Sequence, residues 1–180
     1  FAGCRMPILT SDKLHALSHA VCAASGSAER EAALVADHLV EANLTGHDSH
    51  GVGLLPVYVE KVRAGQLMPN RHAELVSERG AVLVVEGNRG YGQVIGHEAM
   101  QLGVACAREQ GVALLAIRNS FHLGRIGHYA EQCARGGCAS IHFVNVIDHA
   151  PLQAPYAGAE ARFSTNPFCA ALPGEDGTAV

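Results

Sequence analysis

This chain is organised around one polar heptad, Arg118-Asn119-Ser120-Phe121-His122-Leu123-Gly124. Residues 111–117, which precede it, are almost all apolar and of strand length, and this predicts a buried strand. Residues 124–136, which follow it, have helical spacing and contain no proline, so they predict a helix. The heptad is therefore expected at a strand-to-helix junction, where the unpaired N–H groups of a helix start can serve a ligand site.

The heptad carries more chemistry than a turn needs in order to reverse direction. It offers the imidazole of His122, the hydroxyl of Ser120, the amide of Asn119 and the guanidinium of Arg118. Gly124 allows the backbone to approach another group closely. We interpret the heptad as part of an active site. The structural alternative is that His122 only hydrogen-bonds its own turn.

The first part of the chain predicts a small helical domain. Apolar residues recur there at helical spacing, and Pro56 suits the first turn of a helix. Residues 65–79 contain Pro69 and mixed polar residues, and we interpret them as the boundary between two domains. The pattern divides the chain into a helical domain of residues 1–78 and a second domain of residues 79–180. The helices are expected at 10–24, 28–44 and 56–65.

From residue 81 onward, strand and helix patterns alternate, which by itself is typical of β-α-β units. A glycine-rich turn at 87–92 invites comparison with the dinucleotide-binding fingerprint G-x-G-x-x-G. The fingerprint fails because Ile95 stands at the third glycine position and Arg118, not an acid, ends the second strand. The turn is therefore interpreted as a plain tight turn. The expected elements are strands at 81–86, 111–117 and 139–145, helices at 93–110 and 124–136, and short strands at 162–164 and 168–172.

The composition is that of a globular protein and excludes several classes of partner. The chain has 180 residues, of which 48% are hydrophobic and 17% are charged. A net charge of −4 with scattered basic residues gives no footprint for nucleic acid. No apolar run approaches the roughly 18 residues of a membrane span. Six cysteines without a CxxC pair predict reduced thiols and a cytoplasmic location.

A second polar cluster, His47-Asp48-Ser49-His50, precedes the third predicted helix. Three interpretations are open: half of a metal site, a solvated helix cap, or a site for substrate binding and proton transfer. A histidine titrates near neutrality, which suits the third. No second pair of histidines, cysteines or carboxylates stands at ligand spacing, so no metal is expected.

Four segments taken together resemble the malate/L-lactate dehydrogenase family, which is unrelated to the Rossmann-type enzymes of the same name. Its other members are ureidoglycolate, sulfolactate and diketogulonate oxidoreductases and a piperideine-carboxylate reductase. The resemblance extends from about Ile8 through nearly the whole chain. The matching segments are 46–52, 118–124, Asn145 through 154–158, and 164–167.

The resemblance implies an α+β fold with a helical first domain and a non-Rossmann cofactor domain built on a mixed or mostly antiparallel sheet. This revises the β-α-β interpretation, because the helices should then lie on one side of such a sheet. It also implies that the chain covers only about the first half of a family member. The cofactor domain is therefore expected to be truncated, and an acidic catalytic partner to be absent. Enzymes of this family are typically dimers, so the resemblance also implies that this protein forms a homodimer.

The resemblance further implies hydride transfer between NAD or NADP and a 2-hydroxy/2-keto acid or a related cyclic imino acid. His50 is expected to give or take the proton, with Ser49 beside it at the substrate. His122 is expected to be a second active-site histidine near the nicotinamide. The residues expected to contact the cofactor are Ser120, His122, Asn145, Thr165, Asn166 and Pro167.

One departure from the family concerns the substrate carboxylate. Many members have an arginine four to six residues after the histidine-serine pair, where this chain has Leu54 and Leu55. Arg63 or Arg118 is then expected to supply the positive charge, and of the two we assign substrate binding to Arg118. The alternative function is a catalytically inactive fragment that serves as a binding or assembly module. A metal-dependent hydrolase using His47 and His50 ranks third.

Overall fold

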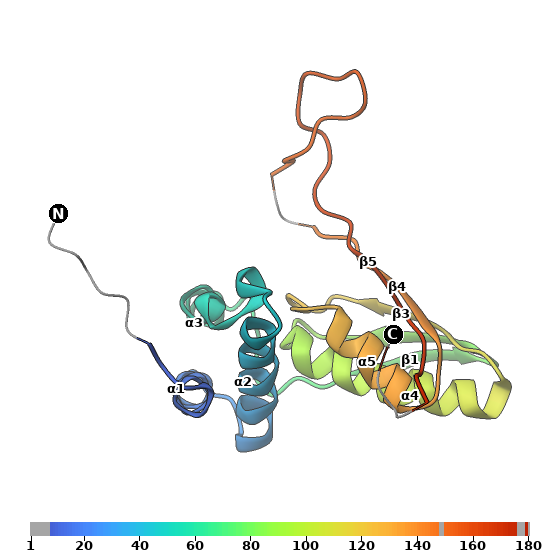
Figure 1. Cartoon of the computed structure of the whole chain (residues 1–180), viewed down its shortest axis with the longest axis horizontal. Coiled ribbons are helices and arrows are strands. Elements are labelled where there is room, and N and C mark those ends of the chain that lie inside the picture. Colours follow the sequence, from blue (N-terminus) through green and yellow to red (C-terminus); the bar gives the residue numbers. More distant parts are fainter. Residues whose placement is uncertain (1–7, 148–149, 176–178, 180) are drawn as a thin grey trace, which may run out of the picture. The chain divides into compact units, whose positions relative to one another are not determined.

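The computed structural model describes residues 8–147, 150–175 and 179, which form parts of two compact units, Phe1–Arg125 and Ile126–Val180. The described part of the first unit holds a helical layer and a three-stranded sheet with one helix on it. The second holds a helix and a two-stranded sheet. The α+β class is confirmed (Figure 1). The predicted domain boundary after residue 78 falls inside the first unit and stays a prediction.

The helical layer consists of α1 (Ser11–Ala24), α2 (Glu29–Leu44) and α3 (Leu55–Arg63). These three helices confirm the first three predicted helices, and Pro56 lies in the first turn of α3 as expected. Two short 3-10 turns, η1 (Asp48–His50) and η2 (Val52–Leu54), lead directly into α3. The fully buried side chains that hold this layer together include Cys22, Val35, Leu39, Tyr58 and Leu67.

The sheet of the first unit is mixed, as the resemblance implied. Its order is β1 (Glu74–Arg79), β2 (Val82–Glu86), β3 (Leu114–Arg118). Strands β1 and β2 pair antiparallel, whereas β2 and β3 pair parallel. Helix α4 (Gly92–Gln110) makes the connection that a parallel pair requires.

Helix α4 covers the inner face of this sheet. Leu83 and Val85 on β2 are buried, and a Cβ added at Gly103 of α4 would lie 3.5 Å from the side chain of Leu115 on β3. On the outer face, Val82 and Leu114 are exposed. The alternation of buried and exposed side chains along the strands follows from the two-residue period of a strand.

The sequence predicts no strand within the boundary segment 65–79, but its second half, 74–79, forms β1. This edge strand is exposed along most of its length and carries three charged side chains. Without an apolar alternation, sequence patterning does not detect it. The backbone hydrogen bonds to β2, and not burial, define the strand.

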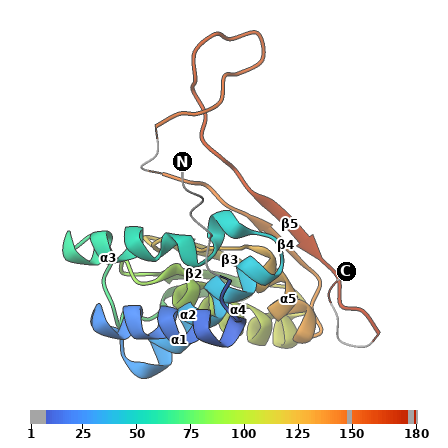
Figure 2. The same ribbon diagram turned by 60° about the vertical axis from the view of Figure 1, so that its left-hand side comes forward.

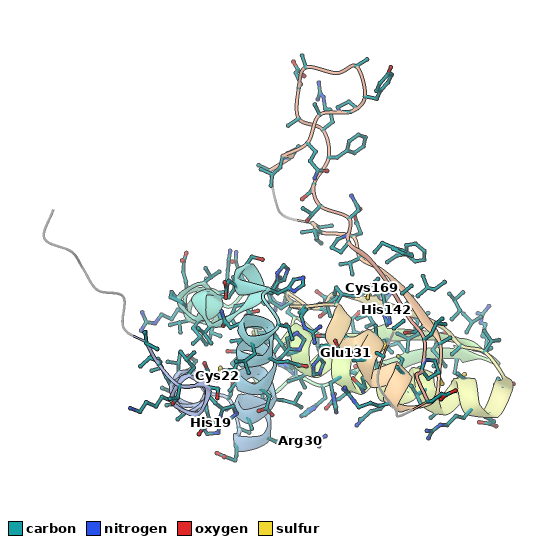
Figure 3. The ribbon with its side chains drawn as sticks, viewed as in Figure 1. His19, Cys22, Arg30, Glu131, His142 and Cys169 are labelled. Atoms are coloured by element: carbon teal, nitrogen blue, oxygen red, sulfur yellow. The ribbon has the colours of Figure 1, made fainter. Side chains whose placement is uncertain are left out.

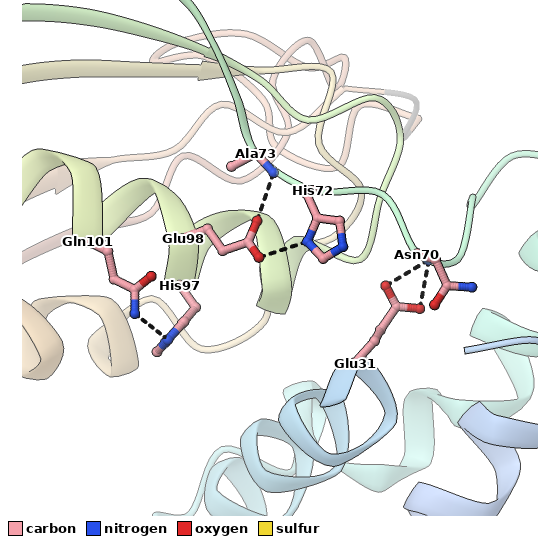
Figure 4. A network of polar contacts seen from close by, with 7 residues as sticks. All are labelled: Glu31, Asn70, His72, Ala73, His97, Glu98 and Gln101. Carbon is pink, nitrogen blue, oxygen red and sulfur yellow. Dashed lines mark hydrogen bonds and ion pairs between the residues drawn. The ribbon is translucent and has the colours of Figure 1, made fainter. Parts of the chain in front are cut away.

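The first half of that segment is held by two carboxylates rather than being a loose connection (Figure 4). Both carboxylate oxygens of Glu31, on α2, accept the backbone N–H of Asn70, at 3.0 and 2.9 Å. Glu98, on α4, accepts the N–H of Ala73 at 2.8 Å and contacts His72 Nδ1 at 2.8 Å. The path from the helical layer to β1 is therefore fixed at both ends.

The second unit contains α5 (Gly127–Arg135), β4 (Ser140–Phe143) and β5 (Phe168–Ala171). Strands β4 and β5 pair antiparallel, with His142 opposite Cys169 (Figure 3). The described residues of the connection between them form a loop, in which an isolated bridge pairs Gln153 with Phe163 (Figure 2).

Two predicted details of this region are wrong. The strand predicted at 162–164 is only the isolated bridge at Phe163. The helix predicted from residue 124 begins at Gly127, since Gly124 has a φ of 75° and cannot continue a right-handed helix. In the described residues, no helix combines the length and the apolar character needed to cross a membrane.

Candidate active site

The two polar clusters singled out in the sequence meet in the first unit. We call residues 47–52 the His50 turn and residues 118–125 the His122 loop. The rings of His50 and His122 stack with their centroids 5.4 Å apart and their planes at 22°. His47 lies edge-on to His50 at 6.2 Å. Three imidazoles from two separate segments therefore lie together.

The His50 turn is attached to the end of α2 by one amide side chain. Asn43 Nδ2 donates to Asp48 Oδ1 at 2.6 Å, and the N–H of Val52 donates to Asn43 Oδ1 at 2.9 Å. A Cβ atom at Gly51 would overlap the Asn43 side chain, so a larger residue there would displace the amide that holds the turn. Asn43 thus fixes both ends of the turn that carries His50.

The surroundings of His50 favour its neutral form. Its pKa lies below the ordinary value of 6.5, first because the ring is partly buried and second because His47 is close by. Ser49 Oγ lies 2.9 Å from His50 Nδ1 and hydrogen-bonds to it. This bond leaves Nε2 as the nitrogen through which His50 can exchange a proton with a ligand.

His122 is held by buried polar groups from two helices. Its Nδ1 lies 2.8 Å from the hydroxyl of Tyr58 on α3, and Gln93 Nε2 on α4 donates to the same hydroxyl at 2.8 Å. Tyr58 is only 2% exposed and Gln93 is fully buried. Burial raises the pKa of Tyr58, so the phenol keeps its proton.

Aromatic rings enclose Tyr58. Tyr91 and Phe121 both pack against it edge to face, with centroids 5.8 and 5.7 Å away. Edge-to-face contacts of this kind are favourable and restrict ring rotation. The hydroxyl that faces His122 is therefore held by packing as well as by hydrogen bonds.

The glycine-rich turn at 87–92 packs against the backbone of the His122 loop. The N–H of Phe121 donates to the carbonyl of Gly90 at 3.1 Å, and the N–H of Arg89 donates to that of Asn119 at 2.8 Å. A Cβ at Gly92 would overlap the carbonyl group of His122. The close contact with the His122 carbonyl is therefore enough to explain the glycine at position 92, and no phosphate-binding role is needed for it.

The far end of the His122 loop is buried against α2. The N–H of Arg125 donates to His38 Nε2 at 3.0 Å, and its guanidinium pairs with Glu41 at 3.1 Å. The Arg125 and His38 residues are both buried. Both ends of the loop are thus fixed, one at β3 and one at α2.

Arg118 lies at the start of the loop and is engaged by a carboxylate. Its Nε donates to Glu86 Oε2 at 2.8 Å, and its side chain is 66% exposed. The pKa of Glu86 is lowered first by the hydrogen bond from Asn119 and also by Arg118. A role for Arg118 in substrate binding would require release of this ion pair, and it stays a prediction.

Arg63 lies at the C-terminal end of α3, whereas the His50 turn precedes the N-terminal end. Arg63 lines an open hollow of about 320 Å³ between α1 and α3. The other lining residues are Val21, Ala24, Ser25, Val59 and Val62. This mostly apolar hollow does not include either of the stacked histidines.

The predicted cofactor residues are divided between the two units. Ser120 lies in the first unit, and its hydroxyl donates to the carbonyl of Phe121 at 2.9 Å. In the second unit, the N–H of Val144 donates to the carbonyl of Pro167 at 3.0 Å. This bond places Asn145 at the same end of the β4–β5 pair as the segment Thr165-Asn166-Pro167. Asn166 Nδ2 donates to the carbonyl of Ser164 at 3.1 Å.

Sequence reasoning missed Asn43, Tyr58 and Gln93. Tyr58 has the helical spacing of a core residue, and nothing local links it to His122. Asn43 gives only a weak signal, as an amide close to a helix end. Within the described ranges, no group of three histidines, cysteines or carboxylates lies close enough to hold a metal ion.

Comparison with known proteins shows the family to which the chain belongs. The sequence pattern described as malate/L-lactate dehydrogenase matches residues 9–180. Hydroxycarboxylate dehydrogenase B of Escherichia coli O157:H7 is 52% identical over 163 residues, which are 91% of this chain and 45% of that protein. L-lactate dehydrogenase of Cupriavidus necator is 40% identical over 143 residues, 79% of this chain and 41% of that protein.

A solved E. coli structure of the malate/lactate dehydrogenase type has the same fold as this chain. It superimposes with a TM-score of 0.91 at 49% identity, over 95% of this chain and 48% of that one. The chain spans slightly less than half the length of these relatives. It belongs to the malate/L-lactate dehydrogenase family.

Proposed function

We propose that this chain carries the proton-handling part of a nicotinamide-dependent oxidoreductase. The reaction is hydride transfer between NAD or NADP and a 2-hydroxy/2-keto acid, or a related cyclic imino acid. The single observation that carries the proposal is the stacked pair of His50 and His122. Its support is a family whose relatives are named as dehydrogenases of hydroxycarboxylates, lactate, malate and sulfolactate.

His50 suits the role of the base in alcohol oxidation. As hydride leaves the substrate carbon, the hydroxyl group must lose its proton. The lowered pKa keeps His50 neutral and able to accept that proton through Nε2, while Ser49 holds Nδ1. In the direction of reduction, the protonated His50 returns the proton to the developing alkoxide.

The stacking of the two rings restricts which of them carries charge. Two imidazolium cations with centroids 5.4 Å apart would repel each other. When His50 holds the substrate proton, His122 therefore stays neutral. A neutral imidazole can still donate one N–H to the substrate oxygen and stabilise negative charge on it.

The donor set of the second unit fits a nicotinamide nucleotide. Asn145, Thr165 and Asn166 provide neutral amide and hydroxyl groups near one end of β4–β5. Such groups can hydrogen-bond ribose hydroxyls and a carboxamide. These are the residues of the second unit proposed to contact the cofactor, and Ser120 and His122 are those proposed in the first unit. The nicotinamide would supply the hydride acceptor when bound.

The substrate carboxylate requires a positive partner, and the proposal assigns it to Arg118. A guanidinium can exchange one carboxylate for another at little cost when its ion pair is exposed. The Arg118 side chain is 66% exposed, and Glu86, whose side chain is 15% exposed, keeps its hydrogen bonds from Asn119 and Asn88 when Arg118 leaves. We also propose that the active form is a homodimer, as expected from the resemblance.

The second candidate function is a binding or assembly module without catalysis. The observation in its favour is an apolar face on the β4–β5 pair. Ile141, Phe143 and Phe168 are 64%, 80% and 64% exposed there. Large exposed apolar side chains that cluster on one face are typical of surfaces that bind another protein segment.

Titration of the chain with NADH and with NADPH, followed by the fluorescence of the reduced nicotinamide, separates the two candidates. Saturable binding of either cofactor supports the oxidoreductase. Absence of saturation up to millimolar cofactor contradicts it and favours the assembly module. His122→Ala should weaken binding, whereas His19→Ala is the matched control because His19 lies on α1 and pairs with Glu29.

A further inference from the structure

Tyr58 connects the buried side of His122 to the interior of the first unit. Its hydroxyl makes two hydrogen bonds, one with Gln93 Nε2 and one with His122 Nδ1, each 2.8 Å long. Tyr58 and Gln93 are buried, on α3 and α4 respectively. The three side chains form a short hydrogen-bonded chain that ends on one nitrogen of the imidazole.

The direction of this chain follows from the donors available. The amide nitrogen of Gln93 only donates, so the Tyr58 oxygen accepts from it. A buried phenol proton needs an acceptor of its own. Among the described residues, the acceptor within hydrogen-bond distance of Tyr58 is His122 Nδ1. A nitrogen that accepts carries no proton, which places the proton of the neutral ring on Nε2.

We propose that Tyr58 is a positioning residue that holds His122 in the tautomer protonated on Nε2. The assignment deepens the proposed function and rests on it for one consequence. With its proton fixed on Nε2, His122 serves as a hydrogen-bond donor to the substrate oxygen. Proton transfer is then left to His50, whose Nδ1 is hydrogen-bonded to the exposed Ser49 hydroxyl and not to a buried side chain.

The orientation of the Gln93 amide decides the polarity of the whole chain. With Nε2 toward Tyr58, Gln93 Oε1 is buried without a hydrogen-bond partner among the described residues. A carboxylate in place of the amide would accept the phenol proton instead of donating. Tyr58 would then accept from His122 Nδ1, and the ring proton would move from Nε2 to Nδ1.

The tautomer of His122 is measured directly by the ¹⁵N chemical shifts of its two ring nitrogens in the labelled chain at a pH above 6.5. In the unmodified chain, Nε2 should carry the proton and Nδ1 should show the shift of an accepting nitrogen. Tyr58→Phe removes the donor, and both tautomers should then be populated. Gln93→Glu should move the proton toward Nδ1.

Tyr91→Phe is the matched control, because it removes another buried hydroxyl from the same aromatic cluster without touching the chain to His122. Its His122 shifts should equal those of the unmodified chain. A proton found mainly on Nδ1 in the unmodified chain would overturn the proposal. So would an unchanged tautomer ratio in Tyr58→Phe when the His50 shifts show that the site is intact.

These measurements need neither cofactor nor substrate, so they fail or succeed independently of the proposed function. If the chain binds cofactor but His122 carries its proton on Nδ1, the role of Tyr58 is contradicted and the proposed oxidoreductase function stands. If His122 carries its proton on Nε2 but the chain binds no cofactor, the role of Tyr58 stands and the proposed oxidoreductase function is contradicted.

Discussion

The His50 turn and the His122 loop present the same side chain on very different supports. The His50 turn is held by one partly exposed amide, Asn43, and residues 47–49 are exposed. The His122 loop is held by buried groups, including Tyr58, Gln93 and Arg125. The difference teaches that local support, and not residue type, decides what a histidine can do. A ring on a turn of exposed residues can exchange protons with its surroundings, whereas a ring whose Nδ1 is bonded to a buried hydroxyl presents one defined N–H.

Removing either ring is expected to have the largest effect. In a longer enzyme that contains this chain, His50→Ala should lower kcat ~100-fold or more, the usual scale for loss of a general base. His122→Ala should lower it by a similar factor, through loss of a donor to the developing charge. Steady-state oxidation of a 2-hydroxy acid measures both. Undiminished turnover in both variants would remove the assignment.

The next effect tests how firmly the His122 loop is packed. Gly92→Ala should lower the free energy of unfolding by roughly 1–3 kcal/mol, because the new methyl overlaps the His122 carbonyl. Gly103→Ala lies on the same helix, and its methyl would meet Leu115 at an ordinary 3.5 Å. It should raise stability by roughly 0.5–1 kcal/mol through helix propensity. Urea denaturation of both variants measures the contrast, and equal values would contradict the packing.

A smaller effect is expected from the support of the His50 turn. Asn43→Ala removes two hydrogen bonds and should cost roughly 1 kcal/mol, since the site is partly exposed. The imidazole resonances of His50 should shift while those of His122 stay in place. Thr45→Ala is the control, because Thr45 bonds only to carbonyls of α2. Shifts confined to His122 would show that the two supports are not separate.

The smallest effect concerns pH. The pKa of His50 is lowered by burial and then by His47. Below 6.5 and above the lowered value, the unfolded chain binds a proton that the folded chain does not, so stability rises with pH in that window. Relative to low pH, the gain in the free energy of unfolding that comes from His50 is complete above pH 6.5, and it is lost as the pH falls through the lowered pKa. His50→Gln should flatten this slope in urea denaturation series, and a slope unchanged by the substitution would contradict the assignment.

Local patterns predicted most of the fold. Helices α1 to α4 and strands β2 to β5 follow from apolar spacing, glycines and Pro56. Strand β1 could not be predicted, because an exposed edge strand rich in charge lacks the alternation on which such inference depends. The β-α-β reading also extended too far along the chain. Strand β4 pairs antiparallel with β5 in a separate sheet, and among the described strands the parallel pair is β2 and β3.

The two histidines could be found from sequence, but their supports could not. Each lies in a short cluster of polar residues, and clustering is a local property. Tyr58 and His122 are 64 positions apart and meet only through packing. Gly92 shows the converse, since the sequence marked it as unusual and the structure assigns it to contact with the His122 carbonyl.

The central claim is that His50 and His122 act as one site. The most direct test is a comparison of kcat in His50→Ala, His122→Ala and the double variant of a longer enzyme that contains this chain. Groups that act as a unit are strongly non-additive, so the double variant should lose no more than about the worse single variant. If the two losses multiply instead, the histidines act independently, and the account of a shared site is contradicted.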